Sequence, residues 1–174
     1  MTVATRLANY LSVTQTDYQV LAHKPTHCAA DSAHAAHLSE ASVVKSVLLR
    51  DRRSGRYLMA LAPASNRLKL GWLEADENAD LEMAREEELV GLFPDCEMGA
   101  VPGFGQAYHV DMVWDDQLAE QAQLYFEAGN HEELIQIDHD DFLQLFGTYR
   151  HDAISLPHES YAQYHADEVR GSKL

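Results

Sequence analysis

The sequence predicts an α+β fold with a mixed β-sheet, on three observations. Segments with the alternating pattern of strands and segments with the 3/4 spacing of helices follow one another irregularly along the chain. One pair of neighbouring strands is joined by a turn signal that is typical of a hairpin, and no repeat period is present. A doubly wound parallel sheet needs a more regular alternation, so the mixed sheet is favoured.

The first part of the chain begins with an amphipathic helix. Residues 4–12 carry apolar side chains at 3/4 spacing, which is typical of a helix with one buried face. Residues 17–22 alternate and predict a strand, and an Ala- and His-rich helix is expected at 29–37. The run 42–49, Ser-Val-Val-Lys-Ser-Val-Leu-Leu, is the strongest strand signal in the chain.

A hairpin follows that strand. The segment Arg-Arg-Ser-Gly at 52–55 is typical of a turn, with a return strand at 56–61 that Pro63 should end. The remaining expected elements, in order, are a helix at 68–79, a short strand near Leu81, a helix at 85–92, a loop at 94–105, a strand at 109–114, a short helix from 115, strands at 124–126 and 133–137, and a helix at 140–146.

The C-terminal residues differ from the rest in composition. Residues 150–174 are polar and rich in His and Tyr, with no clear period. We therefore expect one domain over 1–149 and a peripheral polar tail over 150–174.

The composition excludes several classes of protein. With 13 basic and 28 acidic residues the net charge is −15, so DNA binding is not expected, because non-specific affinity depends on neutralising phosphates. No apolar run is long enough to span a membrane, and the N-terminus lacks the layout of a secretory signal. The two cysteines, Cys28 and Cys96, form no CxxC pair, which fits free thiols in a reducing compartment. A cytoplasmic protein is expected.

Charge is unevenly distributed. Seven of the 13 basic residues lie between Lys45 and Lys69, whereas the charged residues of 74–88 are almost all acidic. Two interpretations remain open, namely two solvated faces or a local cationic patch for a small phosphate-bearing ligand.

Lys45 is the first candidate functional residue because it interrupts the apolar strand. By alternation it shares one strand face with Val43 and Val47. Its ammonium either faces water from an edge strand or points into a cleft, where it can bind phosphate as a point charge.

The segment 99–105, Gly-Ala-Val-Pro-Gly-Phe-Gly, is the second candidate. Its three glycines permit positive φ angles and close backbone approach. It is either a connecting loop or a rigid loop whose N–H groups hold a carbonyl or a phosphate, and it matches no nucleotide-binding fingerprint.

Histidines and nucleophiles give weaker signals. A metal site built from His23, His27, His34 and His37 is less favoured than surface histidines, since the chain contains no HExxH motif. His131 is either a turn residue or a side chain that contacts ligand. Cys28 follows His27 directly, but adjacency in sequence does not place a base on a thiol. We expect neither a metal nor another cofactor.

Four landmarks in this order resemble the YbaK/prolyl-tRNA-synthetase-associated editing domain family, over about residues 5–147. No single landmark is specific, and the ordered set carries the resemblance. The landmarks are the strand and turn at 18–27, Val-Lys-Ser-Val-Leu-Leu at 44–49, the glycine/proline loop at 99–105, and Tyr-Phe-Glu-Ala-Gly-Asn-His at 125–131.

The resemblance implies a partly closed sheet surrounded by helices, and hydrolysis of the ester between a wrong amino acid and the 3′-terminal adenosine of tRNA. Its implied partners are the 3′ end of aminoacyl-tRNA and an aminoacyl-tRNA synthetase. By the same resemblance Lys45 is the essential lysine that holds the terminal phosphate or ribose, and Gly99 places N–H groups beside the ester carbonyl. The residues implied to bind substrate are Ala100, Val101, Pro102, Gly103, Ala128, Gly129, Asn130, His131, Tyr18, His27 and Cys28.

One position departs from the family. Its loop usually has the pattern Gly-x-x-x-Pro, whereas position 103 is glycine here and proline stands at 102. The expected mechanism is attack by a water that the tRNA itself helps to orient, without a protein nucleophile. The alternatives are a non-catalytic module that binds a small aminoacyl-like ligand or a synthetase, and a metal-dependent hydrolase.

Overall fold

Among the described residues, the largest sheet has five strands in the order β5-β2-β3-β6-β9. The computed structural model describes residues 2–161. Strand β2 pairs antiparallel with β5 and β3, whereas β6 is parallel to both β3 and β9, so the expected α+β fold with a mixed sheet is confirmed. The strands are β5 (Leu81–Met83), β2 (Val44–Asp51), β3 (Tyr57–Pro63), β6 (Asp111–Asp115) and β9 (Arg150–Asp152).

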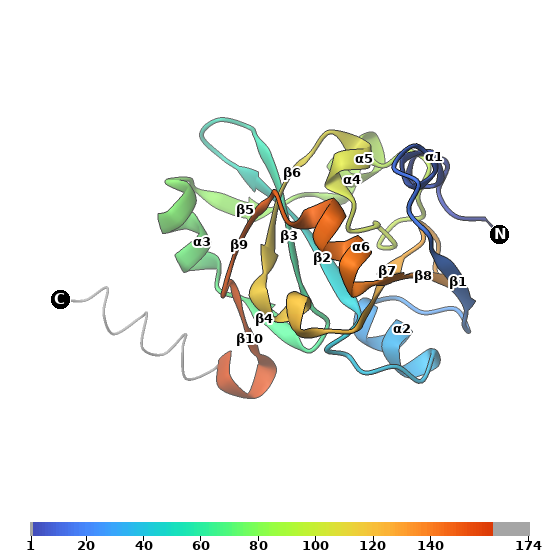
Figure 1. Ribbon diagram of the computed structural model, residues 1–174. Helices are drawn as coiled ribbons and strands as arrows, with labels where there is room; N and C mark the ends of the chain where they lie inside the picture. Colours follow the sequence, from blue (N-terminus) through green and yellow to red (C-terminus); the bar gives the residue numbers. More distant parts are fainter. Residues whose placement is uncertain (1, 162–174) are drawn as a thin grey trace.

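A second sheet stands beside the first (Figure 1). It is antiparallel, in the order β1 (Gln19–Ala22), β8 (Glu133–Asp138) and β7 (Gln123–Glu127). One parallel bridge between Val43 and Tyr125 joins β7 to the residue before β2. A small third sheet pairs β10 (Ser155–Pro157) with β4 (Asn66–Leu68).

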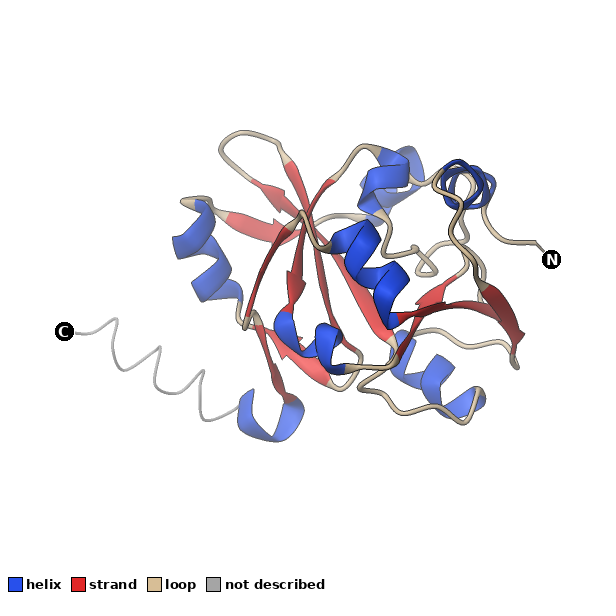
Figure 2. Cartoon of the chain, viewed as in Figure 1, coloured by secondary structure: helices blue, strands red, loops and turns tan. Residues whose placement is uncertain are grey.

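Helices surround these sheets (Figure 2). The core holds a cluster of aromatic rings in which Phe126 of β7 lies 4.8 Å from Phe104 and 5.7 Å from Phe146, measured between ring centroids. Burial of these rings fixes the last helix against β7. The helices are α1 (Thr5–Val13), α2 (Ala29–Ala35), α3 (Leu70–Glu77), α4 (Glu86–Leu92), α5 (Gly105–Tyr108), the 3₁₀ helix η1 (Asp116–Glu120) and α6 (His139–Phe146).

The sequence-based elements agree with the structure, with two corrections. The return strand ends at Pro63 as expected, and this residue lies opposite Val44. The chain then turns into β4, which was not expected. The end of the predicted loop at 94–105 starts the single-turn helix α5, which is too short to show a periodic pattern.

The expected tail is wrong for residues 150–157. Strand β9 pairs parallel with β6, and β10 pairs with β4. Each strand has three residues and the side chains of β9 are all exposed, so neither could produce an alternating apolar pattern. The guanidinium of Arg67 lies 5.7 Å from the ring of Tyr161. The rest of the predicted tail, 162–174, lies outside the described residues.

Candidate functional site

A pocket of about 270 Å³ opens beside β2, between that strand and β7. We call it the β2–β7 pocket. Most of its lining is apolar. Its polar and ionisable side chains come from β2, from β7 and from the segment before α2. It is lined by residues 27–29, 44–48, 83–84, 89, 99, 101 and 127.

The pocket lies where one flank of β2 has no strand partner among residues 2–161. On this flank Ser42 O accepts a hydrogen bond from the β7 residue Tyr125, and Leu48 O accepts one from Ala84 N at 2.9 Å. Alternate residues of a strand present their backbone groups to the same flank, so the N–H and C=O of Ser46 face it as well. The strand therefore offers main-chain groups to a ligand.

Lys45 lies in this pocket, half-buried. Its Nζ donates a hydrogen bond to the backbone carbonyl of Asn66 in β4. Burial lowers the pKa of the Lys45 ammonium, and the nearby guanidinium of Arg67 lowers it further. Lys45 is therefore not an edge-strand lysine that faces water, since β2 lies between β5 and β3 and Nζ bonds to the backbone of β4.

A buried polar network holds the carbonyl that Lys45 contacts. Asn66 Nδ2 donates to Ser155 Oγ at 3.0 Å and to Gln117 Oε1 at 3.2 Å. Asp115, which is fully buried, accepts hydrogen bonds from Ser155 N at 2.8 Å and from Ser155 Oγ at 2.6 Å. The C-terminal strand β10 thus helps to position the lysine.

The glycine loop meets the pocket at its first residues. Gly99 has a φ of +85° and lines the pocket together with Val101, whereas Ala100, Pro102 and Gly103 are buried beneath it. A Cβ at Gly103 would lie 3.0 Å from Ser46 Oγ and 3.0 Å from the ring of Phe126. Glycine at this position lets the loop pack directly on β2 and β7.

The turn after β7 packs against the start of the chain. Gly129 has a φ of +98°, and a Cβ there would lie 2.5 Å from the Cβ of Ala4. Ala128 O accepts a hydrogen bond from Ala4 N, and Asn130 Nδ2 donates to Glu133 Oε2. Ala128, Gly129 and Asn130 do not line the pocket.

The other expected site residues divide into two groups. His27 and Cys28 line the pocket, and Cys28 is an exposed free thiol. His131 lies next to it, with its ring centroid 6.1 Å from that of His27 and its Nε2 2.7 Å from Met98 O. Tyr18 precedes β1, is 37% exposed and does not line the pocket.

Two pocket residues were not selected from the sequence as binding residues. Glu127 is the last residue of β7 and only 7% exposed, and Ser46 follows Lys45 on β2. Glu127 could have been found by the reasoning applied to Lys45, since it is an ionisable residue at the end of an apolar run. Ser46 carries no comparable signal.

Glu127 should make the stability of the protein depend on pH. Burial raises the pKa of its carboxyl above the ordinary 4.5, against the opposing effects of the Ser32 hydroxyl and of His23 and His131. A carboxyl whose pKa is raised by folding contributes stability below pH 4.5 that is lost as the pH rises through the raised value.

The variant Glu127→Gln cannot ionise, so its free energy of unfolding should rise relative to that of the wild type between pH 4.5 and neutral pH. Urea unfolding of both proteins at several pH values measures this difference. A difference that does not change with pH would contradict the assignment.

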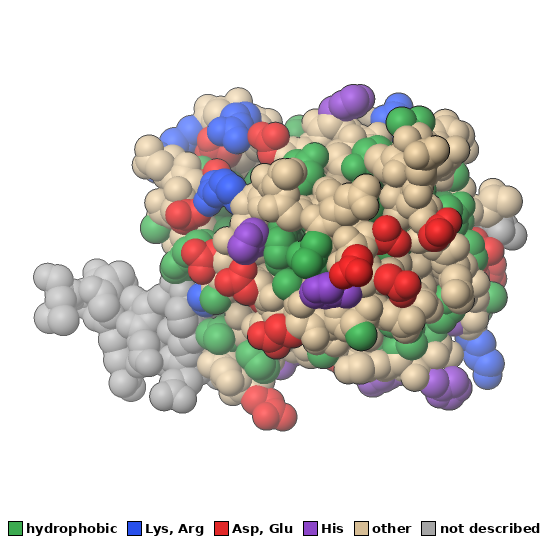
Figure 3. Space-filling model, viewed as in Figure 1, with side chains coloured by type: hydrophobic (Ala, Val, Ile, Leu, Met, Phe, Trp, Pro, Cys, Tyr) green, Lys and Arg blue, Asp and Glu red, His purple; other side chains and the backbone are tan. Residues whose placement is uncertain are grey.

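Acidic side chains form ion pairs with three arginines of the basic stretch. On the face drawn in Figure 3, Lys and Arg side chains gather at the upper left beside Asp and Glu side chains. These pairs offset the positive charge of the hairpin and favour the interpretation of solvated faces. The pairs are Arg50 with Glu82 and Glu88, Arg52 with Asp80 and Glu82, and Arg56 with Asp111, at N···O distances from 2.8 to 3.6 Å.

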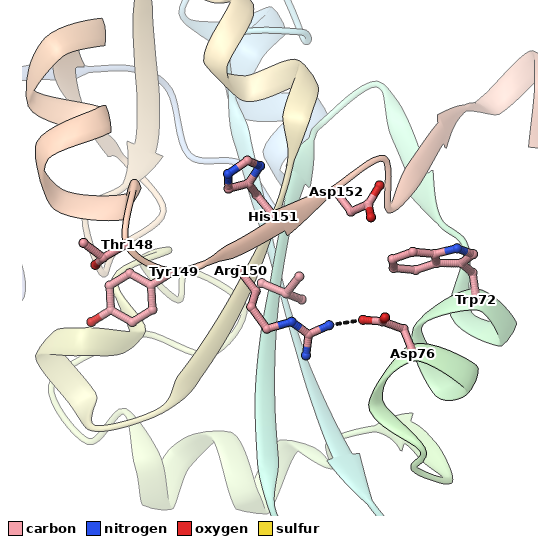
Figure 4. A pocket seen from close by; sticks show the side chains of 8 residues that line it. Trp72, Asp76, Thr148, Tyr149, Arg150, His151 and Asp152 are labelled. Carbon is pink, nitrogen blue, oxygen red and sulfur yellow. Dashed lines mark hydrogen bonds and ion pairs between the residues drawn. The ribbon is translucent and has the colours of Figure 1, made fainter.

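A larger hollow of about 400 Å³ lies between α3 and β9 (Figure 4). Its charged side chains already have partners, since Arg150 pairs with Asp76 and Glu77, and His151 pairs with Asp116. None of its described lining atoms is both buried and without a hydrogen-bond partner.

Two further properties concern residues 2–161. Within this range, no group of three or more His, Cys, Asp or Glu side chains is arranged to hold a metal ion. His34 instead lies 2.8 Å from Glu40, and His23 Nδ1 lies 2.7 Å from Lys24 O. None of the described helices has the length and hydropathy that a bilayer crossing requires.

Comparisons with known proteins relate this chain to one family and to solved structures of similar fold. A family model described as the aminoacyl-tRNA editing domain matches residues 23–145. No curated protein matches the sequence significantly. A crystal structure of "hypothetical protein APE2540" is similar with a TM-score of 0.75 at 21% identity, covering 87% of this chain and 99% of that one. A structure described as "a putative trans-editing enzyme for prolyl tRNA synthetase" has a TM-score of 0.74 at 22% identity, covering 88% and 96%.

Proposed function

Because the chain belongs to the aminoacyl-tRNA editing domain family, we propose that it is a trans-editing deacylase that hydrolyses the ester bond of mischarged aminoacyl-tRNA. The matched residues, 23–145, include every residue that lines the β2–β7 pocket. The proposed substrate is the 3′ end of an aminoacyl-tRNA, with an aminoacyl-tRNA synthetase as a further partner.

One observation carries this proposal. Lys45 and the start of the glycine loop line the same pocket, although they are far apart in the sequence. An ammonium provides a point charge for a phosphate or an electron-rich ribose oxygen, and Gly99 allows the backbone to approach a carbonyl closely. An esterified nucleotide presents both groups within a short distance.

The proposed mechanism needs no protein nucleophile. Water attacks the ester carbonyl carbon, the bond to the 3′ oxygen breaks, and that oxygen takes up a proton to leave as the ribose hydroxyl. The tRNA's own 2′-hydroxyl or phosphate orients the water, while Lys45 holds the nucleotide and N–H groups near Gly99 and Ser46 stabilise the developing oxyanion. Most of the rate then comes from positioning.

The net charge of −15 limits how much RNA the protein can hold. Since Arg50, Arg52 and Arg56 are paired with acids, we expect contacts to be confined to the terminal nucleotides around Lys45 and Arg67. Binding of whole tRNA should therefore be weak and should weaken further as salt is added.

A deacylation panel tests the proposal. Wild-type protein is incubated with tRNAs carrying each of several wrong amino acids, and the release of amino acid is compared with spontaneous hydrolysis in buffer. Acceleration for at least one ester supports the proposal. Binding of aminoacyl-tRNA without acceleration for any ester would overturn it and favour a non-catalytic module.

Cys28 provides a test of the mechanism, because its exposed thiol lines the pocket and is the most nucleophilic group there. With no covalent step, Cys28→Ala should keep most of the wild-type rate constant for deacylation. Loss of activity in this variant, together with a burst of amino-acid release in the wild type, would instead indicate an acyl-enzyme.

A further inference from the structure

Strand β1 is an edge of the three-stranded sheet and lies at the right of Figure 1. It pairs with β8, and no other strand within residues 2–161 pairs with it. His23 N donates to Glu132 O at 2.8 Å, which makes these two residues a hydrogen-bonded pair. Hydrogen-bonded pairs alternate along antiparallel strands, so the N–H and C=O groups of Val20 and Ala22 point away from β8. The free flank of β1 therefore presents main-chain donors and acceptors.

Apolar side chains are exposed along this edge. Tyr18 is 37% exposed and Val20 is 48% exposed, and Ala22 is exposed as well. These three residues share one face of the strand because side chains alternate, whereas Leu21 on the other face packs against a core cluster. An uncovered strand edge that carries apolar side chains favours pairing with a further strand.

We propose that this edge pairs with the same edge of a second copy of the chain, antiparallel about a two-fold axis at Leu21. A hydrogen-bonded pair needs outward main-chain groups on both strands, so Val20 can face only an even-numbered residue. With Val20 opposite Ala22 of the second copy, both outward residues of β1 pair within β1 of that copy. With Val20 opposite Val20 or Lys24, one of the two would pair outside β1. The pairing of Val20 with Ala22 is therefore the register proposed.

Complementary groups at the two ends of the strand favour a second copy over a segment of another protein. In this register Tyr18 of each copy lies opposite Lys24 of the other, and an ammonium near an aromatic ring is attracted to the face of the ring. Pro25 follows Lys24 and stops the strand from extending. Because both copies contribute the same edge, the pair is closed and does not grow into a filament. The inference does not depend on the proposed function.

Sedimentation equilibrium of the full chain measures the association. Because the shared edge is short, we expect a weak and reversible equilibrium between monomer and dimer, observed between about 10 µM and 1 mM protein. Two copies that each carry a charge of −15 repel each other, so added salt should strengthen the dimer. A chain that stays monomeric over the whole range would overturn the proposal, and so would a dimer that salt disperses.

Two variants of Val20 locate the interface. Val20→Pro removes an N–H that points away from β8, so it spares the pairing of β1 with β8 and should weaken the dimer at least about tenfold, since one hydrogen bond is lost from each copy. The matched control Val20→Thr keeps the N–H and a β-branched side chain, and should dimerise like the wild type. Urea unfolding checks that both variants fold. Equal association of Val20→Pro and the wild type would place the interface elsewhere and overturn the proposal.

Disulfide trapping tests the register and does not need the proline variant. Both cysteine variants carry Cys28→Ala, which removes the exposed thiol. At the two-fold axis the Cα atoms of Leu21 in the two copies should lie about 4.5 Å apart, so Leu21→Cys should crosslink on oxidation with copper phenanthroline. The control Gln19→Cys should not, because its two copies lie about 13 Å apart along the strands. Equal crosslinking of the two variants, or none in Leu21→Cys, would overturn the proposal.

Discussion

Replacement of Lys45 by alanine should reduce kcat/KM for mischarged tRNA at least about 100-fold. Lys45 lines the pocket and is half-buried, and its ammonium is hydrogen-bonded to Asn66 O, so the position of the ammonium is fixed before substrate arrives. A preorganised charge in a partly desolvated site stabilises a transition state more than the same charge in water. Steady-state deacylation of the preferred ester measures the loss.

Two controls accompany this variant. Lys69→Ala removes an ammonium that lies 5.4 Å from the ring of Trp72 and does not line the pocket, so it should leave the rate unchanged. Urea unfolding of Lys45→Ala should show a cooperative transition like that of the wild type, since a partly desolvated charge contributes little to stability. Full activity in a folded Lys45→Ala protein would refute the assignment of Lys45.

Asp115→Ala should lower the free energy of unfolding by about 3 kcal/mol. The carboxylate of Asp115 is fully buried and accepts hydrogen bonds from both the amide and the hydroxyl of Ser155 and from Gln117 N. Its removal leaves these donors unpaired in the interior. Because Ser155 and Gln117 also hold Asn66, the variant should reduce deacylation as well. Urea unfolding and kcat/KM measure the two effects.

The neighbouring residue gives a matched control. Asp116 is exposed and pairs with His151 at the surface, so Asp116→Ala should change the free energy of unfolding by less than about 1 kcal/mol. An Asp115→Ala protein as stable as the wild type would show that the buried network does not stabilise β10 against β4.

Local patterns in the sequence predicted most of the fold. The apolar run around Lys45 and the alternating strands at 124–126 and 133–137 extend over enough residues to show a period, and the structure contains them. Strands β9 and β10 have three residues each and take their partners from distant parts of the chain, so no local pattern marks them. Their position depends on tertiary pairing.

The candidate site, like the fold, was predicted from the sequence only in part. Lys45, Gly99, His27 and Cys28 were expected together and line one pocket. The small residues at 128–130 were expected beside the substrate but contact the N-terminal segment through Ala4, a contact that only the folded chain reveals. Glu127 depends on register, since a shift of one residue along β7 would point its carboxyl away from the pocket.

Location of the bound ester end tests the central claim most directly. ¹⁵N-labelled protein is titrated with an adenosine analogue that carries an amino acid through a 3′-amide, and the backbone amide resonances are followed. Binding in the β2–β7 pocket predicts the largest shifts at Ser46, Gly99 and Val101. Shifts confined to Arg150 and His151, which line the hollow of Figure 4, would contradict it.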